Sequence, residues 1–319
     1  MKTRALALLL LSSTLVSALV ACGDDDVGTA PLVDAGLDSG ERADAGPRPQ
    51  TFADIGASTE GLAIGRTPAG DSVMYVGARD GHVVRVTPDG IVTDFAEVDA
   101  PVGIAVRASG EVLVCGEDAT GSVLFELDPM TGGKTVLVAT GPGGVALGLC
   151  NYVAVAPDDS LVFSDSAANE LYRTAADGSG ITRITDAIQY PNGLAFSPDG
   201  ATLYVASWSG SAVFALSFDR TTGLYGAPTM VVTDIANIDG LVTLSDGELL
   251  LVTSGSGLQR ITPSGAPELL YGPRLFMLPA NGVMGDTAFG ANNLYLTSLS
   301  RMTIERVTID TAGVSLPVR

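Results

Sequence analysis

The stretch PNGLAFSPDGATLYV, from Pro191 to Val205, contains the pattern that decides the fold. An apolar run, GLAF, is followed by a Ser-Pro-Asp-Gly turn and by a second run with Thr, Leu, Tyr and Val. This pattern is typical of a short β-hairpin, and no part of it has the period and length of a helix. One residue stands out. Asn192 is a polar side chain at the start of a run that otherwise has the composition of buried core.

Five other segments repeat this pattern of apolar run, Gly/Asp/Pro turn, second apolar run, another turn and an alternating third run. They begin at Glu60, Val102, Asn151, Asp239 and Gly285. The centres of the six second runs lie 38 to 49 residues apart, at Tyr75, Leu113, Val162, Tyr204, Leu250 and Tyr295. A four-stranded propeller blade takes roughly 40–50 residues. The sequence therefore predicts an all-β, six-bladed β-propeller, and a β-sandwich with coincidental spacing is the alternative.

Polar side chains stand at the start of several repeats, at the position that Asn192 has in its own. The first run of each repeat is the least polar and is predicted to be the innermost strand of a blade. Because all innermost strands run in the same direction, their first residues should meet at one end of the central channel. The leading positions are Glu60, Val102, Asn151, Asn192 and Asp239, with the sixth open between Asn281 and Asp286.

Two carboxylates and two carboxamides at one register form an all-oxygen ligand set. Such a set suits a hard cation such as Ca²⁺. In any single repeat, an Asn-Gly or Asp-Gly pair is more simply explained as a turn. Glu60 is not a turn residue, and four oxygen-bearing residues in register favour a metal site formed by Glu60, Asn151, Asn192 and Asp239.

The N-terminal segment has the pattern of an export signal. Lys2 and Arg4 precede the apolar run from Ala5 to Val20, and LVAC at residues 19–22 resembles a bacterial lipobox. We expect residues 1–21 to be a lipoprotein signal peptide and Cys22 to carry the lipid, with an ordinary secretory cleavage site as the alternative. Residues 22–50 are predicted to form a disordered acidic tether, and residues 51–319 the propeller. The protein should then be lipid-anchored in the periplasm, at the outer membrane or at the cell surface.

The charge of the chain excludes one class of partner. Of its 36 acidic and 17 basic residues, seven acids and two bases lie in the tether and two bases in the signal. The propeller segment keeps 29 acids and 13 bases, and it has no basic patch interleaved with aromatic residues. Nucleic acid is therefore not expected as a partner. We expect the protein to be a monomer that binds a small-molecule substrate or a glycan. It should contact the membrane only through the lipid on Cys22.

The predicted positions of the two further cysteines and of the single histidine can also be read from the repeats. Cys115 is predicted at the end of a second strand, and Cys150 directly precedes Asn151 in the next repeat. Both should lie at the same end of adjacent blades, so a disulfide and a pair of buried thiols both stay open. His82 is predicted to be a surface residue of a hairpin rather than a catalytic base.

Four segments resemble successive signatures of the gluconolactonase/senescence-marker-protein/luciferin-regenerating-enzyme family, over roughly residues 52–319. They are TEGLAIG from Thr59, LCNYVAVAPDDSLVFSDS from Leu149, YPNGLAFSPDGATLYVAS from Tyr190 and NIDGLVTLSDGELLLV from Asn237. The resemblance implies a six-bladed propeller with a divalent metal at the channel mouth, Ca²⁺ as the first candidate and Zn²⁺ as the second. It places the family's metal ligands on Glu60, Asn151, Asn192 and Asp239, and its general base on Asp239.

The chain also departs from the family pattern. EGLAIG stands where members of the family read EGP followed by Trp, and the Asp that follows the second strand is kept at Asp165 but is missing from YVASWS. The segments DGHVVRVTPDG and VFSDSAANELYR are also similar to the strictosidine-synthase-like branch, in which some members lack the metal.

Two functions follow from these patterns. The first is a metal-dependent hydrolase of a lactone, or of an organophosphate ester as a less favoured substrate, with Asp239 as general base and Trp208 at the rim of the pocket. Ordinary packing between blades is the alternative role for Trp208. The second function is a non-catalytic, surface-tethered propeller that binds a sugar, a cell-wall fragment or a protein, with a metal that only braces the channel.

Overall fold

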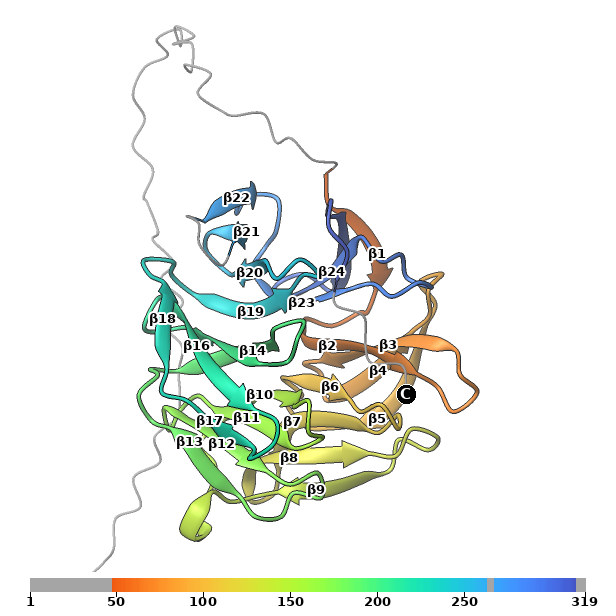
Figure 1. The fold of residues 1–319 in the computed structure, drawn as a ribbon. Coiled ribbons are helices and arrows are strands. Elements are labelled where there is room, and N and C mark those ends of the chain that lie inside the picture. Colours follow the sequence, from red (N-terminus) through yellow and green to blue (C-terminus); the bar gives the residue numbers. More distant parts are fainter. Residues whose placement is uncertain (1–47, 263–266, 314–319) are drawn as a thin grey trace, which may run out of the picture. The chain divides into compact units, whose positions relative to one another are not determined.

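Six small antiparallel sheets form a ring in the part of the chain that the computed structural model describes, residues 48–262 and 267–313 (Figure 1). Besides strands, the described residues contain one short 3₁₀-helix, η1 (Pro142–Gly144). The predicted six-bladed β-propeller is thereby confirmed. The signal segment, Cys22 and the tether up to residue 47 lie outside the described residues. No described helix has the length and apolar character needed to cross a bilayer.

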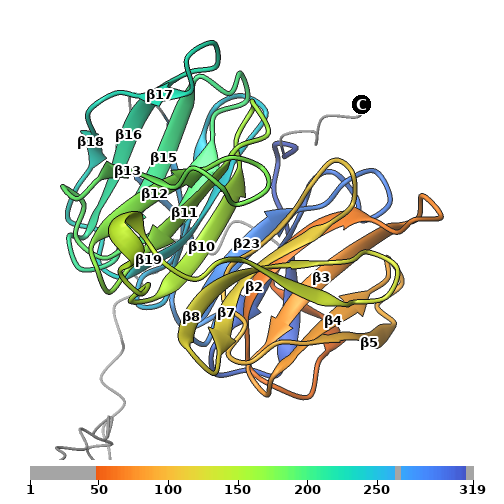
Figure 2. The same cartoon turned by 90° about the horizontal axis from the view of Figure 1, so that it is seen from below.

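The first three blades each consist of four strands, which follow one another in the chain from the innermost strand outward. Blade 1 comprises β2 (Thr59–Arg66), β3 (Ser72–Ala78), β4 (His82–Val86) and β5 (Val92–Glu97). Blade 2 comprises β6 (Ile104–Val106), β7 (Val112–Asp118), β8 (Gly121–Leu127) and β9 (Lys134–Val138). Blade 3 comprises β10 (Cys150–Val155), β11 (Leu161–Asp165), β12 (Glu170–Thr174) and β13 (Thr182–Thr185). Figure 2 shows the first of these sheets with its strands β2 to β5 side by side.

The other three blades vary the same plan. Blade 4 comprises β14 (Pro191–Phe196), β15 (Thr202–Ser207) and β16 (Ala212–Asp219), whose outer edge pairs with both β17 (Leu224–Tyr225) and β18 (Thr229–Val232). Blade 5 comprises β19 (Ile238–Thr243), β20 (Leu249–Thr253), β21 (Gly257–Ile261) and β22 (Glu268–Tyr271). Blade 6 comprises β23 (Pro279–Met284), β24 (Asn293–Ser298), β25 (Thr303–Thr308) and β1 (Gln50–Asp54).

The turn between the first two strands of a blade explains the recurrent Gly and Asp of the repeats. In blade 4 the Gly200 amide donates to the Ser197 carbonyl at 2.8 Å, with the φ of Gly200 at +69°. Glycine adopts this left-handed conformation without steric cost. Blade 3 has Asp159 at the same place, with φ +66°, and Asp is one of the few other residues that tolerates it.

In every blade except blade 3, the leading residue is followed by a glycine that serves close packing and not a turn. Gly193 and Gly240 lie inside β14 and β19. A Cβ on Gly193 would lie 2.5 Å from the Asp239 carbonyl oxygen of the next blade, and one on Gly61 would lie 1.8 Å from that of Val102. The turn interpretation of the Asn-Gly and Asp-Gly pairs is therefore wrong. These glycines let neighbouring innermost strands touch around the ring.

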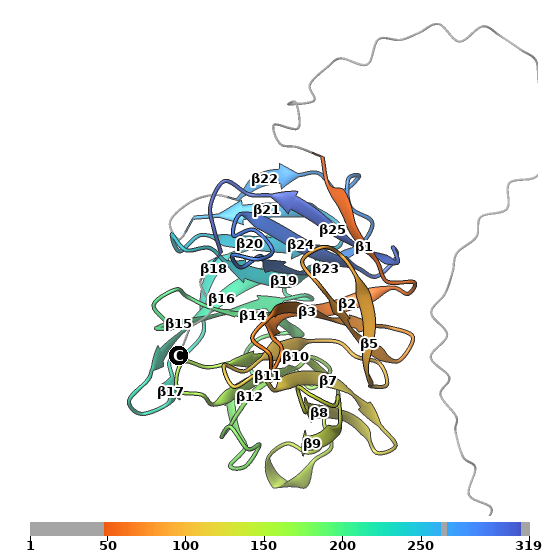
Figure 3. The ribbon, with the colours of Figure 1, turned by 90° about the vertical axis from the view of Figure 1, so that its right-hand side faces the viewer.

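The first and last strands of the described chain close the ring. β1 pairs antiparallel with β25, from Gln50 opposite Arg306 to Asp54 opposite Thr303 (Figure 3). Phe52 of β1 packs edge-on against Tyr295, with ring centroids 4.7 Å apart. The last blade thus takes its outermost strand from the N-terminal side. Its innermost strand is β23, so the expectation that the sixth repeat begins at Gly285 is wrong.

Candidate metal centre

The leading residues of five blades share an irregularity of the strand pairing. In each blade the register between the innermost and second strands shifts around the leading residue, as between Thr59 and Leu62 and between Pro191 and Leu194. The other three shifts lie at Cys150/Tyr152, Ile238/Gly240 and Pro279/Gly282. A bulge re-aims a side chain that would otherwise alternate with the pleat. The five re-aimed residues are Glu60, Asn151, Asn192, Asp239 and Asn281.

The structure decides the position that the sequence left open. Asn281 lies in β23 at the bulge, and its Oδ1 would be 2.6 Å from a Cβ on Gly240, beside Asp239. Asp286 follows the end of β23 and instead accepts a hydrogen bond from Ser72 Oγ at 2.6 Å. Blade 2 brings the apolar Val102 to the ring. The candidate centre therefore has five oxygen-bearing side chains and one apolar position.

These polar side chains are buried, and several of their oxygens lack a partner. The exposed fractions are 8% for Glu60 and between 2% and 5% for the other four residues. Asn192 Oδ1, Asp239 Oδ1 and Asn281 Oδ1 are buried without a hydrogen bond in the protein. A buried oxygen without a partner costs roughly 1–3 kcal/mol. Three such oxygens on three adjacent innermost strands are a donor set that fits a hard cation.

The two carboxylates act on each other. Burial, and then the charge of Glu60, raise the pKa of Asp239 well above its usual range, while the neighbouring Asn192 amide and Arg79 oppose this increase. Burial also raises the pKa of Glu60, against the lowering effect of Arg79. In both groups burial is the main cause of the shift, because it disfavours the charged form. Arg79 Nη1 forms an ion pair with Glu60 Oε2 and supplies positive charge that acts against this effect.

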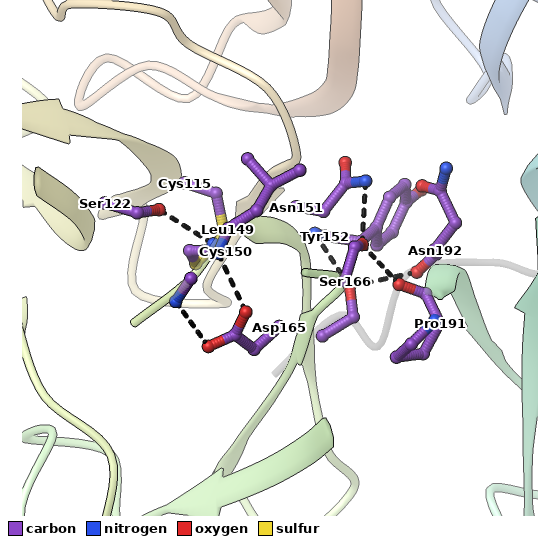
Figure 4. The surroundings of a disulfide bond; sticks show 12 residues. Cys115, Ser122, Leu149, Cys150, Asn151, Tyr152, Asp165, Ser166, Pro191 and Asn192 are labelled. Atoms are coloured by element: carbon purple, nitrogen blue, oxygen red, sulfur yellow. Dashed lines mark hydrogen bonds between the residues drawn. A yellow bond between two sulfur atoms is a disulfide. The ribbon is translucent and has the colours of Figure 1, made fainter. Parts of the chain in front are cut away.

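Asn151 is positioned by a hydroxyl that links two blades. Its Nδ2 donates to Ser166 Oγ at 2.9 Å, and Ser166 donates to the Pro191 carbonyl at 2.5 Å (Figure 4). Since its nitrogen is committed to Ser166, the carbonyl oxygen of the amide is left as the free end. The serine connects the strand that carries Asn151 to the strand that carries Asn192.

Two tyrosines of the site were missed by the sequence reasoning. Tyr152 stands where other blades have the packing glycine, and burial together with the charge of Asp239 raises its pKa to about 12. Tyr190 is half-buried, and burial, Glu60 and Asp239 raise its pKa. Both phenols therefore lie within the electrostatic reach of the carboxylates. Trp208 directly follows β15, and its amide donates to the Tyr190 carbonyl at 3.1 Å.

A disulfide and a buried carboxylate hold the start of β10. Cys115 and Cys150 are bonded, with Cα atoms 5.2 Å apart, so blades 2 and 3 are crosslinked one residue before Asn151 (Figure 4). The expectation that Cys115 ends its strand is wrong, because β7 continues to Asp118. Asp165 accepts hydrogen bonds at 2.8 Å from the amides of both Gly148 and Leu149. The preceding loop is thus fixed on both sides of Asn151.

The described residues contain no group of three or more His, Cys, Asp and Glu side chains that could hold a metal ion. The candidate centre contains only two carboxylates, because three of its five oxygen-bearing side chains are amides. Amide oxygens are ordinary ligands of Ca²⁺, and a buried oxygen without a partner is costly. His82 opens β4 and lies 3.3 Å from Asp80, at the surface.

Comparison with known proteins places this geometry in a family. The model of the "SMP-30/Gluconolactonase/LRE-like region" matches residues 63–300, which is more than half of the chain and includes Asn151, Asn192, Asp239 and Asn281. The chain belongs to the SMP-30/gluconolactonase/LRE-like family. Glu60 lies just before the matched segment. A search of curated proteins returned no match.

Solved structures of the family share the fold. A gluconolactonase from Xanthomonas campestris aligns with a TM-score of 0.69 at 23% identity, over 82% of this chain and 89% of its own. The calcium-binding protein regucalcin from Agrobacterium tumefaciens aligns with a TM-score of 0.64 at 19% identity, over 84% of this chain and 98% of its own. A luciferin-regenerating enzyme aligns with a TM-score of 0.64 at 17% identity, over 86% of this chain and 97% of its own. At these identities the similarity shows the fold, and the SMP-30/gluconolactonase/LRE-like family gives a lactonase type of function as the general expectation.

Proposed function

We propose that the protein is a divalent-metal-dependent hydrolase of lactones, with its centre at the channel end formed by Glu60, Asn151, Asn192, Asp239 and Asn281. The observation that carries the proposal is the set of three partnerless buried oxygens on adjacent strands, beside two mutually repelling carboxylates. The family supports the reaction class. Ca²⁺ is the first candidate for the ion, because every donor is an oxygen, and Zn²⁺ is the second.

The residues of the chain divide the work of such a reaction. A bound divalent cation supplies Lewis-acid polarisation of a carbonyl and makes water more acidic. Glu60, Asp239 and the three amides would hold the ion. Asp239 would also take the proton from the attacking water as general base. In this proposal Tyr190 and Trp208 line the rim of the pocket, and the phenol of Tyr190 would donate to a developing alkoxide.

The decisive experiment is lactone hydrolysis with added Ca²⁺ or Zn²⁺, comparing the wild type with Asp239→Ala. We expect the variant to lose turnover by about 10²-fold or more, as is typical for general-base removal, while circular dichroism shows a folded protein. Chelation should abolish wild-type turnover, and restoring the ion should recover it. Full activity of Asp239→Ala, or of chelated protein, would remove the base or the metal from the mechanism.

A propeller that binds without catalysis is the outcome to separate from this. Metal binding by calorimetry without hydrolysis of any aldonolactone or simple aliphatic lactone would favour that second function, with a sugar, a cell-wall fragment or a protein as ligand. The export signal, the lipid on Cys22 and a monomeric state belong to the proposal under either function, because none of them depends on catalysis.

A further inference from the structure

Among the five oxygen-bearing leading residues, all of which the structure describes, Glu60 alone forms an ion pair. Its partner Arg79 directly follows β3, in the hairpin that leads to β4, and its backbone amide donates to the Ser58 carbonyl at 2.8 Å. The Arg79 side chain is 41% exposed, whereas that of Glu60 is 11% exposed. The guanidinium therefore reaches a buried carboxylate from the solvent side.

This ion pair meets only part of the need of the site for positive charge. Arg79 contacts Glu60, while Asn192 Oδ1, Asp239 Oδ1 and Asn281 Oδ1 keep no partner. A guanidinium is planar and donates in a fixed fork, so it cannot serve oxygens that approach from several directions. A spherical cation can, since it accepts six or more oxygen ligands in a flexible geometry.

We propose that Arg79 is a built-in competitor of the divalent cation: the guanidinium and the metal compete for Glu60, and metal binding displaces Arg79 towards solvent. The inference rests on the metal site of the proposed function and adds a determinant of its affinity. The charge of an arginine is permanent, so its presence beside Glu60 always opposes a second cation. The exposed position of the side chain gives it room to leave.

Two consequences follow from competition. Arg79 stabilises the metal-free protein, because without it Glu60 would be a buried carboxylate without a counter-charge. Arg79 destabilises the metal-loaded protein, because two cations repel each other at short range. Removing the guanidinium should therefore have effects of opposite sign on the stability of the two forms.

The test is calorimetric titration of Ca²⁺ into the full-length protein after chelation and dialysis. Arg79→Gln is expected to bind Ca²⁺ about tenfold more tightly or more than the wild type, because a full charge is lost at contact distance. Arg79→Lys keeps the charge and should stay near the wild type. Arg301→Gln is the matched control. Arg301 lies in the corresponding hairpin of blade 6, is 35% exposed and pairs with Glu305, which is 5% exposed and not a leading residue.

Thermal unfolding gives a second measurement that is independent of turnover. Arg79→Gln should have a lower Tm than the wild type without Ca²⁺ and a larger rise in Tm on adding it. Equal or weaker Ca²⁺ binding by Arg79→Gln, in a wild type that binds, overturns the competition and leaves the proposed function standing. Absence of Ca²⁺ and Zn²⁺ binding in all variants overturns both the competition and the metal site.

Discussion

Tyr190, beside the candidate centre, has an unusual backbone conformation. Its φ of +44° is rare for a residue with a Cβ. The conformation is held by two hydrogen bonds: its amide donates to Asn169 Oδ1 at 2.8 Å, and its carbonyl accepts from the Trp208 amide at 3.1 Å. Backbone strain that is fixed in this way is concentrated at functional sites. The backbone that carries this phenol is thus held in one conformation.

We predict that Tyr190→Phe keeps the fold and the Ca²⁺ affinity but lowers kcat/KM for a lactone. Loss of one hydrogen bond to the leaving alkoxide should cost about tenfold, or ~1.4 kcal/mol of transition-state stabilisation. Steady-state kinetics measures the change. Tyr204→Phe is the control, since Tyr204 is a half-buried tyrosine of the same blade. Burial and the charge of Asp199 raise its pKa, and the site carboxylates do not contribute. Equal losses in both variants would show that the role of Tyr190 is only structural.

The sequence could place the leading residues but not the side chains that reach them from elsewhere. The sequence is enough to predict four of the leading residues, because each starts a repeat and a repeat has a fixed position in a propeller. These are Glu60, Asn151, Asn192 and Asp239. Arg79 and Tyr190 lie in hairpins and loops, whose paths depend on contacts between blades. One signal was present: Pro follows Tyr190, Ala100 and Leu278, each of which has a positive φ just before an innermost strand.

At the scale of elements, β10 carries more restraints than the single residue it presents. The disulfide crosslinks its first residue to β7, Asp165 holds the loop before it, and Ser166 ties Asn151 to the next blade. The two cysteines in the sequence are enough to suggest the bridge. They are not enough to choose between a bridge and free thiols, because the choice depends on the separation of two strands from different blades.

We predict that the Cys115→Ser/Cys150→Ser variant unfolds more easily than the wild type. The bridge closes a loop of 35 residues, so its loss should lower the free energy of unfolding by about 3–4 kcal/mol in the chain-entropy model. Denaturant titration with and without a reducing agent measures this. Reductant should bring the wild type down to the variant and leave the variant unchanged. A wild type that does not respond to reductant in the denaturant range would contradict the prediction.

The sheets themselves are predictable from the sequence in number and spacing, except for the start of the last one. In PANGVM only Val and Met follow the Asn-Gly pair, so the repeat pattern places the start of the sixth blade at Gly285, directly after β23. Its fourth strand cannot be found within the repeat, because β1 lies at the other end of the described chain. Local patterns report neighbours in sequence, and this pairing is not local.

At the scale of the whole molecule, the ring depends on β1 remaining in place. Phe52→Ala should lower the free energy of unfolding by roughly 2–3 kcal/mol, since Phe52 loses ring contacts with Phe289 and Tyr295. Thermal unfolding and limited proteolysis near residue 50 would detect the loss. Leu224→Ala, at an exposed edge of blade 4, is the control and should change little. Equal stability of the two variants would mean that β1 contributes little to closure.

We also predict that Cys22→Ser abolishes acylation and releases the propeller from the membrane. The lipobox at residues 19–22 motivates this expectation. Mass spectrometry of the mature N-terminus, together with fractionation of membranes, would measure both effects. Serine substitution at Cys115 is a suitable control, because it removes a thiol without changing the lipobox. An unacylated mature protein that begins at a residue other than Cys22 would contradict the anchor.

The position of β1 also sets the order in which the molecule can be completed. Gln50 and its partner Arg306 are 256 residues apart. At ~5–20 residues per second of synthesis, β1 waits roughly 10–50 s for the strand it needs. Five sheets can assemble in turn as the chain emerges, but β1 has no partner strand until Thr303–Thr308 have been made, and the ring cannot close before then. Closure of the ring therefore comes last, as a single late event.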